Sequence, residues 1–198
     1  MLINFKEKKP NERYALMVQS IIPRPIAWVM TEDKEVLNIA PFSYFAPLSS
    51  EPPTLIVSVG HRPDGSQKDT LRNIRNSKKC VVCIIDDTHF DMMHFSSKSL
   101  DTNESEIDVF NIKIESILDG FPPIPKDIKV AYFCEYSQEI DLKGSKTIPL
   151  ILEIKHLYLD ENIISDKEKM YLDFSSIARV GRGYASLQDN INTPKIPQ

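Results

Sequence analysis

The sequence is poor in several kinds of residue, and each scarcity excludes a class of protein. Among 198 residues there are only three cysteines, an odd number, which argues against a disulfide framework and favours a reducing compartment. No apolar stretch approaches the roughly 20 residues that span a bilayer. Residues 1–10 are charged and lack the apolar core of a signal peptide. The chain is therefore expected to be cytoplasmic and to have no membrane partner.

An excess of positive charge is also missing. The formal net charge is −4, which argues against a nucleic-acid partner. Hydrophobic residues make up 41% of the chain and charged residues 26%, as in an ordinary globular protein. The length favours one domain over residues 1–198. Residues 1–10 and 189–198 are expected to be flexible tails.

Several familiar catalytic and metal-binding patterns are absent. Cys80 and Cys83 form C-x-x-C, but the surrounding run is typical of a buried strand, where residues three apart point to opposite faces. A thioredoxin-like redox pair is therefore disfavoured. His89 and His94 are five residues apart and lack a third ligand, so no metal site is predicted. No G-x-S-x-G elbow exists, and no side chain can be assigned as catalytic.

Apolar patterning predicts a mainly β protein with a few helices. Six or seven short antiparallel strands without alternating βαβ units indicate a closed or partly closed barrel. Strands are predicted at 26–30, 36–45, 54–59, 80–85, 128–142 and 147–159. Short helices are predicted after Asn11, after Ser66 or Asp69 as the N-cap, and over 88–95. Residues 96–106 are predicted to form a long loop, mobile or serving as a lid.

The most informative stretch covers residues 22–54. Two extended runs flank a charged break, which is typical of adjacent antiparallel strands. Pro41 lies inside the second run, so that run belongs at a sheet edge or a bulge. A strand that interrupts pairing while presenting Asn38 and Ser43 suits a flat, polar ligand. An edge strand followed by a proline-rich loop explains the same pattern without a ligand.

Residues 66–70 (Ser-Gln-Lys-Asp-Thr) begin a predicted helix and are the best candidate for an anion site. A helix N-terminus offers unpaired N–H groups and the positive end of the helix dipole. Lys68 adds a full charge and Thr70 a hydroxyl group, so a phosphate suits this position. The alternative is an ordinary helix start with a solvated lysine.

Three blocks of sequence resemble the flavin reductase-like family, whose fold is the FMN-binding split β-barrel of antiparallel, Greek-key type. The blocks are residues 24–27 (Arg-Pro-Ile-Ala), 38–45 (Asn-Ile-Ala-Pro-Phe-Ser-Tyr-Phe) and 49–53 (Ser-Ser-Glu-Pro-Pro). They are followed by Lys68-Asp69-Thr70 and Asn73. Weaker similarity extends to about Tyr184. Residues 178–184 depart from the family's closing motif, because Arg182 stands where a glycine is usual.

The resemblance implies a role for particular residues. Lys68 and Thr70 would approach the flavin phosphate, and Asn38, Ser43 and Ser49 would position the ribityl chain and ring. Trp28 either borders the isoalloxazine or packs in the core. Phe174 either packs on the flavin or fills the core. The full set of predicted cofactor-binding residues is Trp28, Asn38, Ser43, Tyr44, Phe45, Ser49, Lys68, Asp69, Thr70 and Phe174.

The function implied is an FMN-binding oxidoreductase of the flavin reductase type, with FAD as an alternative cofactor. NADH or NADPH would deliver a hydride to the flavin, which carries the chemistry itself. Electrons would pass to free flavin, oxygen, a partner oxygenase or a small acceptor. Two subunits would form a dimer, and each flavin would lie near the interface between them. The alternatives are an electron carrier that does not oxidise nicotinamide, and a split barrel that has lost flavin.

Overall fold

The computed structural model of the protein describes residues 1–101 and 104–187. The tail predicted at 189–198 lies outside the described residues. The helical elements are η1 (Phe5–Glu7), α1 (Pro10–Ser20), α2 (Asp69–Ser77), η2 (Asp87–His89), α3 (Phe90–Phe95), α4 (Glu106–Val109) and η3 (Glu161–Ile163). The strands of the main sheet are β2 (Ala27–Asp33), β3 (Val36–Phe42), β4 (Phe45–Ser50), β5 (Pro53–Gly60), β6 (Lys79–Ile84), β9 (Val130–Glu139) and β10 (Thr147–Leu159). The shorter strands are β1 (Arg24–Pro25), β7 (Ile114–Glu115), β8 (Ile124–Pro125), β11 (Ile164–Asp166), β12 (Tyr171–Leu172), β13 (Ser176–Val180) and β14 (Gly183–Leu187).

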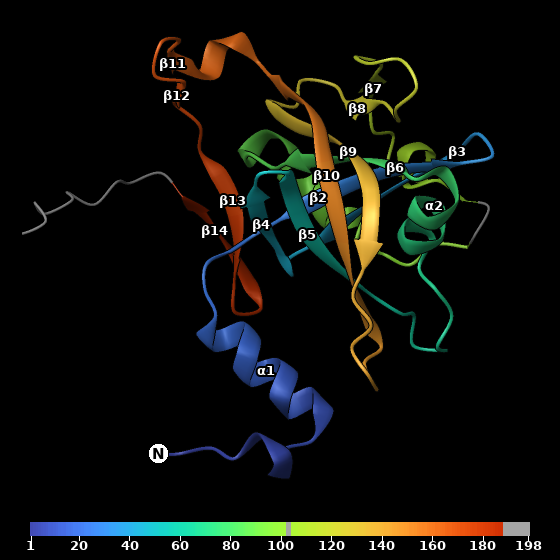
Figure 1. The fold of residues 1–198 in the computed structure, drawn as a ribbon, viewed down its shortest axis with the longest axis vertical. Coiled ribbons are helices and arrows are strands. Elements are labelled where there is room, and N and C mark those ends of the chain that lie inside the picture. The colour runs from blue at the N-terminus through green and yellow to red at the C-terminus, as the bar shows by residue number, and fades with distance from the viewer. Residues whose placement is uncertain (102–103, 188–198) are drawn as a thin grey trace, which may run out of the picture.

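Seven antiparallel strands form the main sheet, in the order β3-β2-β6-β9-β10-β5-β4 (Figure 1). Hairpins join β2 to β3, β4 to β5 and β9 to β10, whereas β5 and β6 are separated in the sheet by β9 and β10. A second sheet of order β1-β13-β14 joins the N-terminal side of β2 to the C-terminal hairpin. The predicted mainly β split barrel is confirmed.

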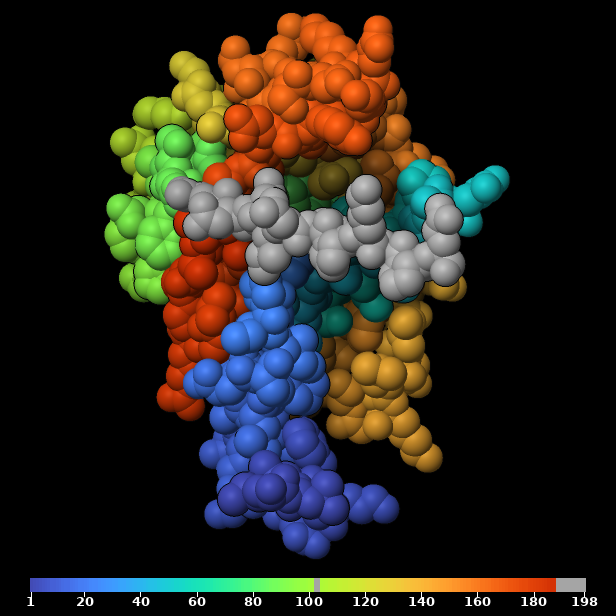
Figure 2. Space-filling view, turned by 90° about the vertical axis from the view of Figure 1, so that its left-hand side faces the viewer, coloured from blue at the N-terminus to red at the C-terminus, as the bar shows by residue number. Residues whose placement is uncertain are grey.

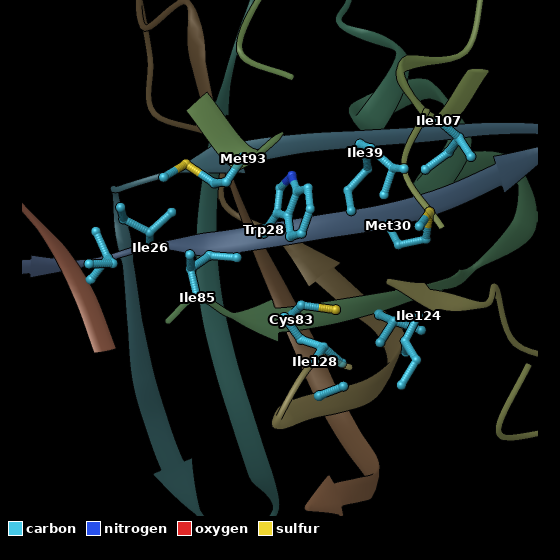
Figure 3. Close-up of a cluster of buried hydrophobic side chains, with 14 of the residues drawn as sticks. Ile26, Trp28, Met30, Ile39, Cys83, Ile85, Met93, Ile107, Ile124 and Ile128 are labelled. Atoms are coloured by element: carbon cyan, nitrogen blue, oxygen red, sulfur yellow. The ribbon is translucent and has the colours of Figure 1, made fainter. Parts of the chain in front are cut away.

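The central strands are buried on both faces, and β6 illustrates the reason. Its side chains alternate between two separate hydrophobic clusters, as the period-two geometry of a strand requires. Cys83 lies in the cluster around Trp28 and Met30, shown in Figure 3. Cys80 lies on the opposite face with Leu71 of α2. The prediction that the two cysteines point to opposite faces is confirmed, and a disulfide between them is excluded by that geometry.

The predicted strand over 36–45 is wrong in extent. Strand β3 ends at Phe42, and residues 43–44 lead the chain to β4 at the opposite edge of the sheet. The sequence predicted a proline-rich loop after this strand, but Pro47 lies in β4, next to a register shift. Pro41 and Pro47 therefore both occupy edge strands, where a missing N–H donor leaves no ladder partner unsatisfied.

The predicted helix caps are also wrong. Helix α1 starts at Pro10 rather than after Asn11, because proline suits the first helical position and the Glu12 carboxylate accepts the backbone N–H of Lys9 at 2.9 Å. Helix α2 is preceded by Lys68, and no side chain caps it. Asp69 is its first residue, and Ser66 lies outside it.

Helix α1 extends away from the barrel together with η1, which lies within the segment predicted to be a flexible tail. Figure 2 shows this N-terminal segment projecting beside the C-terminal hairpin of β13 and β14. Only Val18 of α1 is buried. Within residues 1–101 and 104–187, no helix is long and apolar enough to cross a membrane.

Candidate functional site

Two cavities lie next to each other along edge strand β3. The larger has a volume of about 400 Å³ and the smaller about 40 Å³. Asn38 and Ala40 face the small cavity, and Phe42 faces the large one. Ser97, just after α3, lines both. An elongated ligand could therefore occupy both cavities at once.

The small cavity has the chemistry of an anion site. It lies at the N-terminus of α2, where no side chain caps the first N–H groups. Burial, with a smaller effect of the nearby Arg62 charge, lowers the pKa of the Lys68 ammonium. In the described ranges no carboxylate pairs with Lys68, whose Nζ lies 5.4 Å from the centre of the Phe42 ring. A desolvated cation beside an uncapped helix favours a bound anion.

A buried hydrogen-bond network fixes Asn38 at the floor of the small cavity. The Asn38 amide donates to Glu106 Oε2 at 2.8 Å, and its carbonyl accepts from Thr70 Oγ1 at 2.9 Å. Glu106 also accepts the Ile39 backbone N–H at 3.2 Å. Burial raises the pKa of the Glu106 carboxyl. Because both ends of the Asn38 amide are engaged, Asn38 and Thr70 hold strand β3 against α2 and α4.

Asp69 is occupied by two arginines rather than left open to a ligand. Its carboxylate pairs with Arg62 from the loop before α2 and with Arg72 one turn further along the helix. Arg62 also lines the small cavity. Asp69 therefore orients the Arg62 guanidinium group at the edge of the anion site.

The large cavity has apolar walls and a positively charged rim. Its apolar side consists of Ile26, Phe42 and Met93. Ile26 and Met93 lie at one end of the hydrophobic cluster in Figure 3. Arg179 and Arg182 from the C-terminal hairpin also line the cavity. A flat molecule with an apolar face suits such a space.

An aromatic group completes the rim of the large cavity. The Tyr184 ring packs edge-on against Phe90, with ring centres 5.0 Å apart. His94 Nδ1 lies 2.9 Å from Tyr184 Oη, and the Arg179 guanidinium lies 4.3 Å from the Tyr184 ring centre. These contacts fix the direction of Arg179 and tie α3 to β14.

The remaining predicted residues are distributed around the two cavities. Trp28 is fully buried, and its indole N–H donates to Ser96 Oγ at 2.9 Å, so it packs behind the small cavity. Ser43 lines the large cavity and a third, apolar cavity, which Tyr44 and Phe45 also line. Ser49 is exposed, and its hydroxyl is engaged with the backbone of Glu51. Phe174 is half-buried in the segment between β12 and β13.

Several residues of the two cavities were not predicted from the sequence. Glu106 reaches Asn38 across 68 positions of the chain, and no local pattern marks it. His94 was considered only as a metal ligand, and Arg62 was not considered. Arg182 was noted only as a departure from a motif. The described residues contain no group of three or more His, Cys, Asp or Glu side chains suited to a metal ion.

Comparison with known proteins gives a consistent result. The family model "Flavin reductase like domain" matches residues 18–179. An uncharacterised protein from Aquifex aeolicus is 31% identical over 183 residues, which cover 90% of this chain and 91% of that protein. The uncharacterised protein YwrF from Bacillus subtilis is 34% identical over 81% of this chain and 80% of its own.

Two solved structures are similar over nearly the whole chain. Nitrilotriacetate monooxygenase component B from Bacillus cereus has a TM-score of 0.89 at 30% identity, covering 98% of each chain. The 2-nitrobenzoate 2-nitroreductase NbaA from Pseudomonas fluorescens has a TM-score of 0.88 at 26% identity, covering 100% of this chain and 96% of its own.

Proposed function

Because the chain belongs to the flavin reductase-like family, we propose that it is an oxidoreductase that works through bound FMN. The proposed reductant is NADH or NADPH, and the flavin passes the electrons on to an acceptor. FAD is the alternative cofactor. The observation that carries this proposal is Lys68, a desolvated ammonium with no carboxylate partner among the described residues, beside the uncapped start of α2.

The position and polarity of the two cavities support FMN as the proposed ligand. A phosphate at the small cavity would meet Lys68, Arg62 and the first N–H groups of α2. The ribityl chain would run along β3 past Ala40, which lines the small cavity, and Ser97, which lines both cavities. The ring would then lie in the large cavity against Phe42 and Met93.

The chemistry that flavin supplies when bound is uptake of a hydride and release of electrons to an acceptor. The residues of this chain bind the flavin and orient it. Lys68 and Arg62 hold the phosphate, and Asp69 keeps Arg62 in position. Asn38, Thr70 and Glu106 fix β3 and so set the depth of the groove. No side chain needs to act as a general acid or base in this scheme.

We also propose a homodimer and an electron-accepting partner. The apolar cavity lined by Met17, Ile21, Tyr44 and Phe45 lies between the base of α1 and the start of β4, beside the large cavity. A second copy covering it would lie close to the bound flavin. The similarity to a monooxygenase component B supports a partner oxygenase as the acceptor.

The test is the visible absorption spectrum of the purified protein. FMN is added, free flavin is removed by desalting, and the protein is titrated without oxygen with NADH and then with NADPH. A retained flavin spectrum that bleaches during one titration is the expected result and identifies the reductant.

The other outcomes separate the alternatives. A retained spectrum that neither nucleotide bleaches would favour an electron carrier that does not oxidise nicotinamide. If no flavin is retained, a steady-state assay of NADH and NADPH oxidation with free FMN decides between flavin as an exchangeable substrate and no flavin function. Absence of both retention and turnover would overturn the proposal.

A further inference from the structure

Arg182 places an unpaired positive charge at the large cavity. Strands β13 and β14 pair with Val180 opposite Gly183, so Gly181 and Arg182 form the two-residue turn between them. The Arg182 side chain is exposed yet lines the large cavity. Among the described residues no carboxylate pairs with it.

Arg179 places a second guanidinium group at the same cavity. This group lies 4.3 Å from the centre of the Tyr184 ring, and the Tyr184 side chain is itself in contact with His94 and Phe90. In the described ranges Arg179 also has no carboxylate partner. The direction of its charge is therefore set before any ligand arrives.

The sheet around these arginines adds positive charge instead of neutralising it. Arg24 of β1 pairs directly with Arg179 of β13. The buried Arg24 guanidinium donates to backbone carbonyl oxygens, including that of Gly181 in the turn at 3.2 Å. Like charges directly opposite each other destabilise a sheet. The stability of the fold therefore does not explain this concentration of charge in a chain whose net charge is −4, whereas a bound anion does.

The proposed function leaves one anion without a binding site, and that anion belongs to the reductant. The flavin ring is assigned to the apolar wall of the large cavity, and the flavin phosphate to Lys68 and Arg62 in the small cavity. In NADH and NADPH a single ribose separates the nicotinamide from the diphosphate. A nicotinamide that reaches a ring in the large cavity therefore brings its diphosphate to the same region. Arginine suits phosphate oxygens because its planar fork donates two parallel N–H···O bonds.

We propose that Arg182, together with Arg179, binds the diphosphate of the nicotinamide dinucleotide that reduces the flavin. The inference rests on the proposed function, because the nicotinamide has to meet a flavin ring in the large cavity. The dihydronicotinamide loses a hydride, which is one proton with two electrons, to the flavin and leaves as the oxidised dinucleotide. Arg182 binds the dinucleotide and takes no part in this transfer. Because NADH and NADPH share the diphosphate, Arg182 serves both.

The first experiment separates binding of the dinucleotide from hydride transfer. Reduction of the FMN-loaded protein is followed without oxygen by stopped-flow absorbance. We expect Arg182→Ala to raise the apparent dissociation constants of NADH and NADPH alike by about tenfold, and to leave the limiting rate of reduction unchanged. Arg182→Lys should raise them less, since lysine keeps the charge and loses the fork. Lys143→Ala, which removes an exposed cation from the β9–β10 hairpin, is the charge-matched control and should leave them unchanged.

A hydride donor without phosphate provides the second control. N-benzyl dihydronicotinamide should reduce the bound flavin at the same rate in the wild type and in Arg182→Ala. A slower reaction of this donor in the variant would show that Arg182 acts on the flavin, and would overturn the proposal. A raised dissociation constant for NADPH alone would assign Arg182 to the additional phosphate of NADPH, and would overturn it too.

A binding measurement keeps failure of this inference distinct from failure of the proposed function. ADP-ribose carries the diphosphate without the nicotinamide, and adenosine lacks both. Each is titrated by calorimetry into the FMN-loaded wild type, Arg182→Ala and Lys143→Ala. We expect ADP-ribose to bind the wild type at least about tenfold more tightly than adenosine. Arg182→Ala should remove most of that preference, and Lys143→Ala should keep it.

The two proposals then fail separately. If the dinucleotides reduce the flavin but the preference for ADP-ribose is absent, or survives in Arg182→Ala, the diphosphate site is overturned and the flavin function stands. If FMN is not retained, or neither dinucleotide reduces it, the same titrations of the protein decide. A preference that depends on Arg182 supports the diphosphate site although the proposed function fails, and its absence overturns both.

Discussion

Lys68 is the single residue on which flavin retention should depend most. Its ammonium is partly desolvated and has no carboxylate partner in the described ranges, so a phosphate would supply the missing counter-charge. We expect Lys68→Ala to raise the FMN dissociation constant about ten- to a hundredfold, the usual contribution of a charge-assisted hydrogen bond. Fluorescence titration of FMN measures this, with Lys143→Ala as the charge-matched control. Unchanged FMN affinity in Lys68→Ala would contradict the proposal that Lys68 binds the flavin phosphate.

Asp86 should make the stability of the protein depend on acid pH. Burial alone would raise the pKa of its carboxyl, but the hydrogen bond and charge of His89, together with Lys129, outweigh burial and hold the pKa below its ordinary value. His89 Nδ1 lies 3.0 Å from Asp86 Oδ1, and its Nε2 lies 2.9 Å from the Lys126 carbonyl oxygen. The ionised carboxylate thus stabilises the junction between β6 and η2.

The sign of the pH effect follows from the lowered pKa. The stabilisation is present above the unfolded-state pKa of about 3.9 and is lost as pH falls through the lower folded-state value. We expect Asp86→Asn to reduce the free energy of unfolding by about 1–2 kcal/mol at pH 7. The difference from the wild type should shrink as pH falls below about 4. Urea unfolding across this range measures it, with exposed Asp141→Asn as the control. A difference independent of pH would contradict the argument.

At the scale of elements, the β13–β14 hairpin carries three residues of the large cavity, with Arg179 on β13, Arg182 in the turn and Tyr184 on β14. Gly181 adopts φ +56°, in the left-handed region that disfavours other residues. A Cβ at this position would also meet the side-chain amide of Gln19 on α1. The Gly181 carbonyl accepts a hydrogen bond from Arg24 Nη2 at 3.2 Å. The turn is therefore tied to β1 and α1 as well as to the cavity.

Gly181→Ala should therefore destabilise the protein by about 1–2 kcal/mol, the cost of the left-handed conformation for a residue with a Cβ. Gly181→Asn should cost less, since asparagine tolerates that conformation better. Thermal unfolding monitored by circular dichroism ranks the two variants against the wild type. Equal stability of Gly181→Ala and the wild type, or a larger loss for asparagine than for alanine, would show that the backbone conformation is not the limiting factor.

At the scale of the whole molecule, helix α1 extends from the barrel (Figure 1), and Val18 is its only buried residue. Met17 and Ile21 are exposed to 37% and 56%, and both line the apolar cavity at the start of β4. A helix that extends from the barrel with an apolar side beside such a cavity suits a contact with a second copy of the chain.

We expect the protein to sediment as a dimer, and Met17→Glu with Ile21→Glu to shift it toward the monomer. Two buried carboxylates at an apolar interface would lack partners and oppose association. Sedimentation velocity measures the change. Ile140→Glu, at an exposed position in the β9–β10 hairpin, is the control and should remain dimeric. A monomeric wild type, or a double variant that stays dimeric, would rule out this face as the dimer interface.

The sequence by itself determined most strands of the main sheet and the fold class, because side-chain alternation is a local property of a strand. The apolar run around Cys80 indicated a central strand. In the strand predicted at 54–59, the alternating residues Leu55, Val57 and Val59 are all buried. The motif blocks identified the family. Residues 66–70 also indicated a candidate anion site at the start of α2, since a helix N-terminus is encoded by residues next to each other.

Only the tertiary structure decided how these parts meet. Glu106 and Asn38 are 68 positions apart, and Trp28 and Ser96 equally so, yet both pairs form buried hydrogen bonds. Asp69 was predicted to bind the cofactor. Its ion pairs with Arg62, from the loop before α2, and with Arg72 depend on how that loop folds, which the sequence did not predict. The large cavity combines β3, α3 and the β13–β14 hairpin. A cavity is a space between elements, so its shape and charge depend on long-range packing that no local pattern encodes.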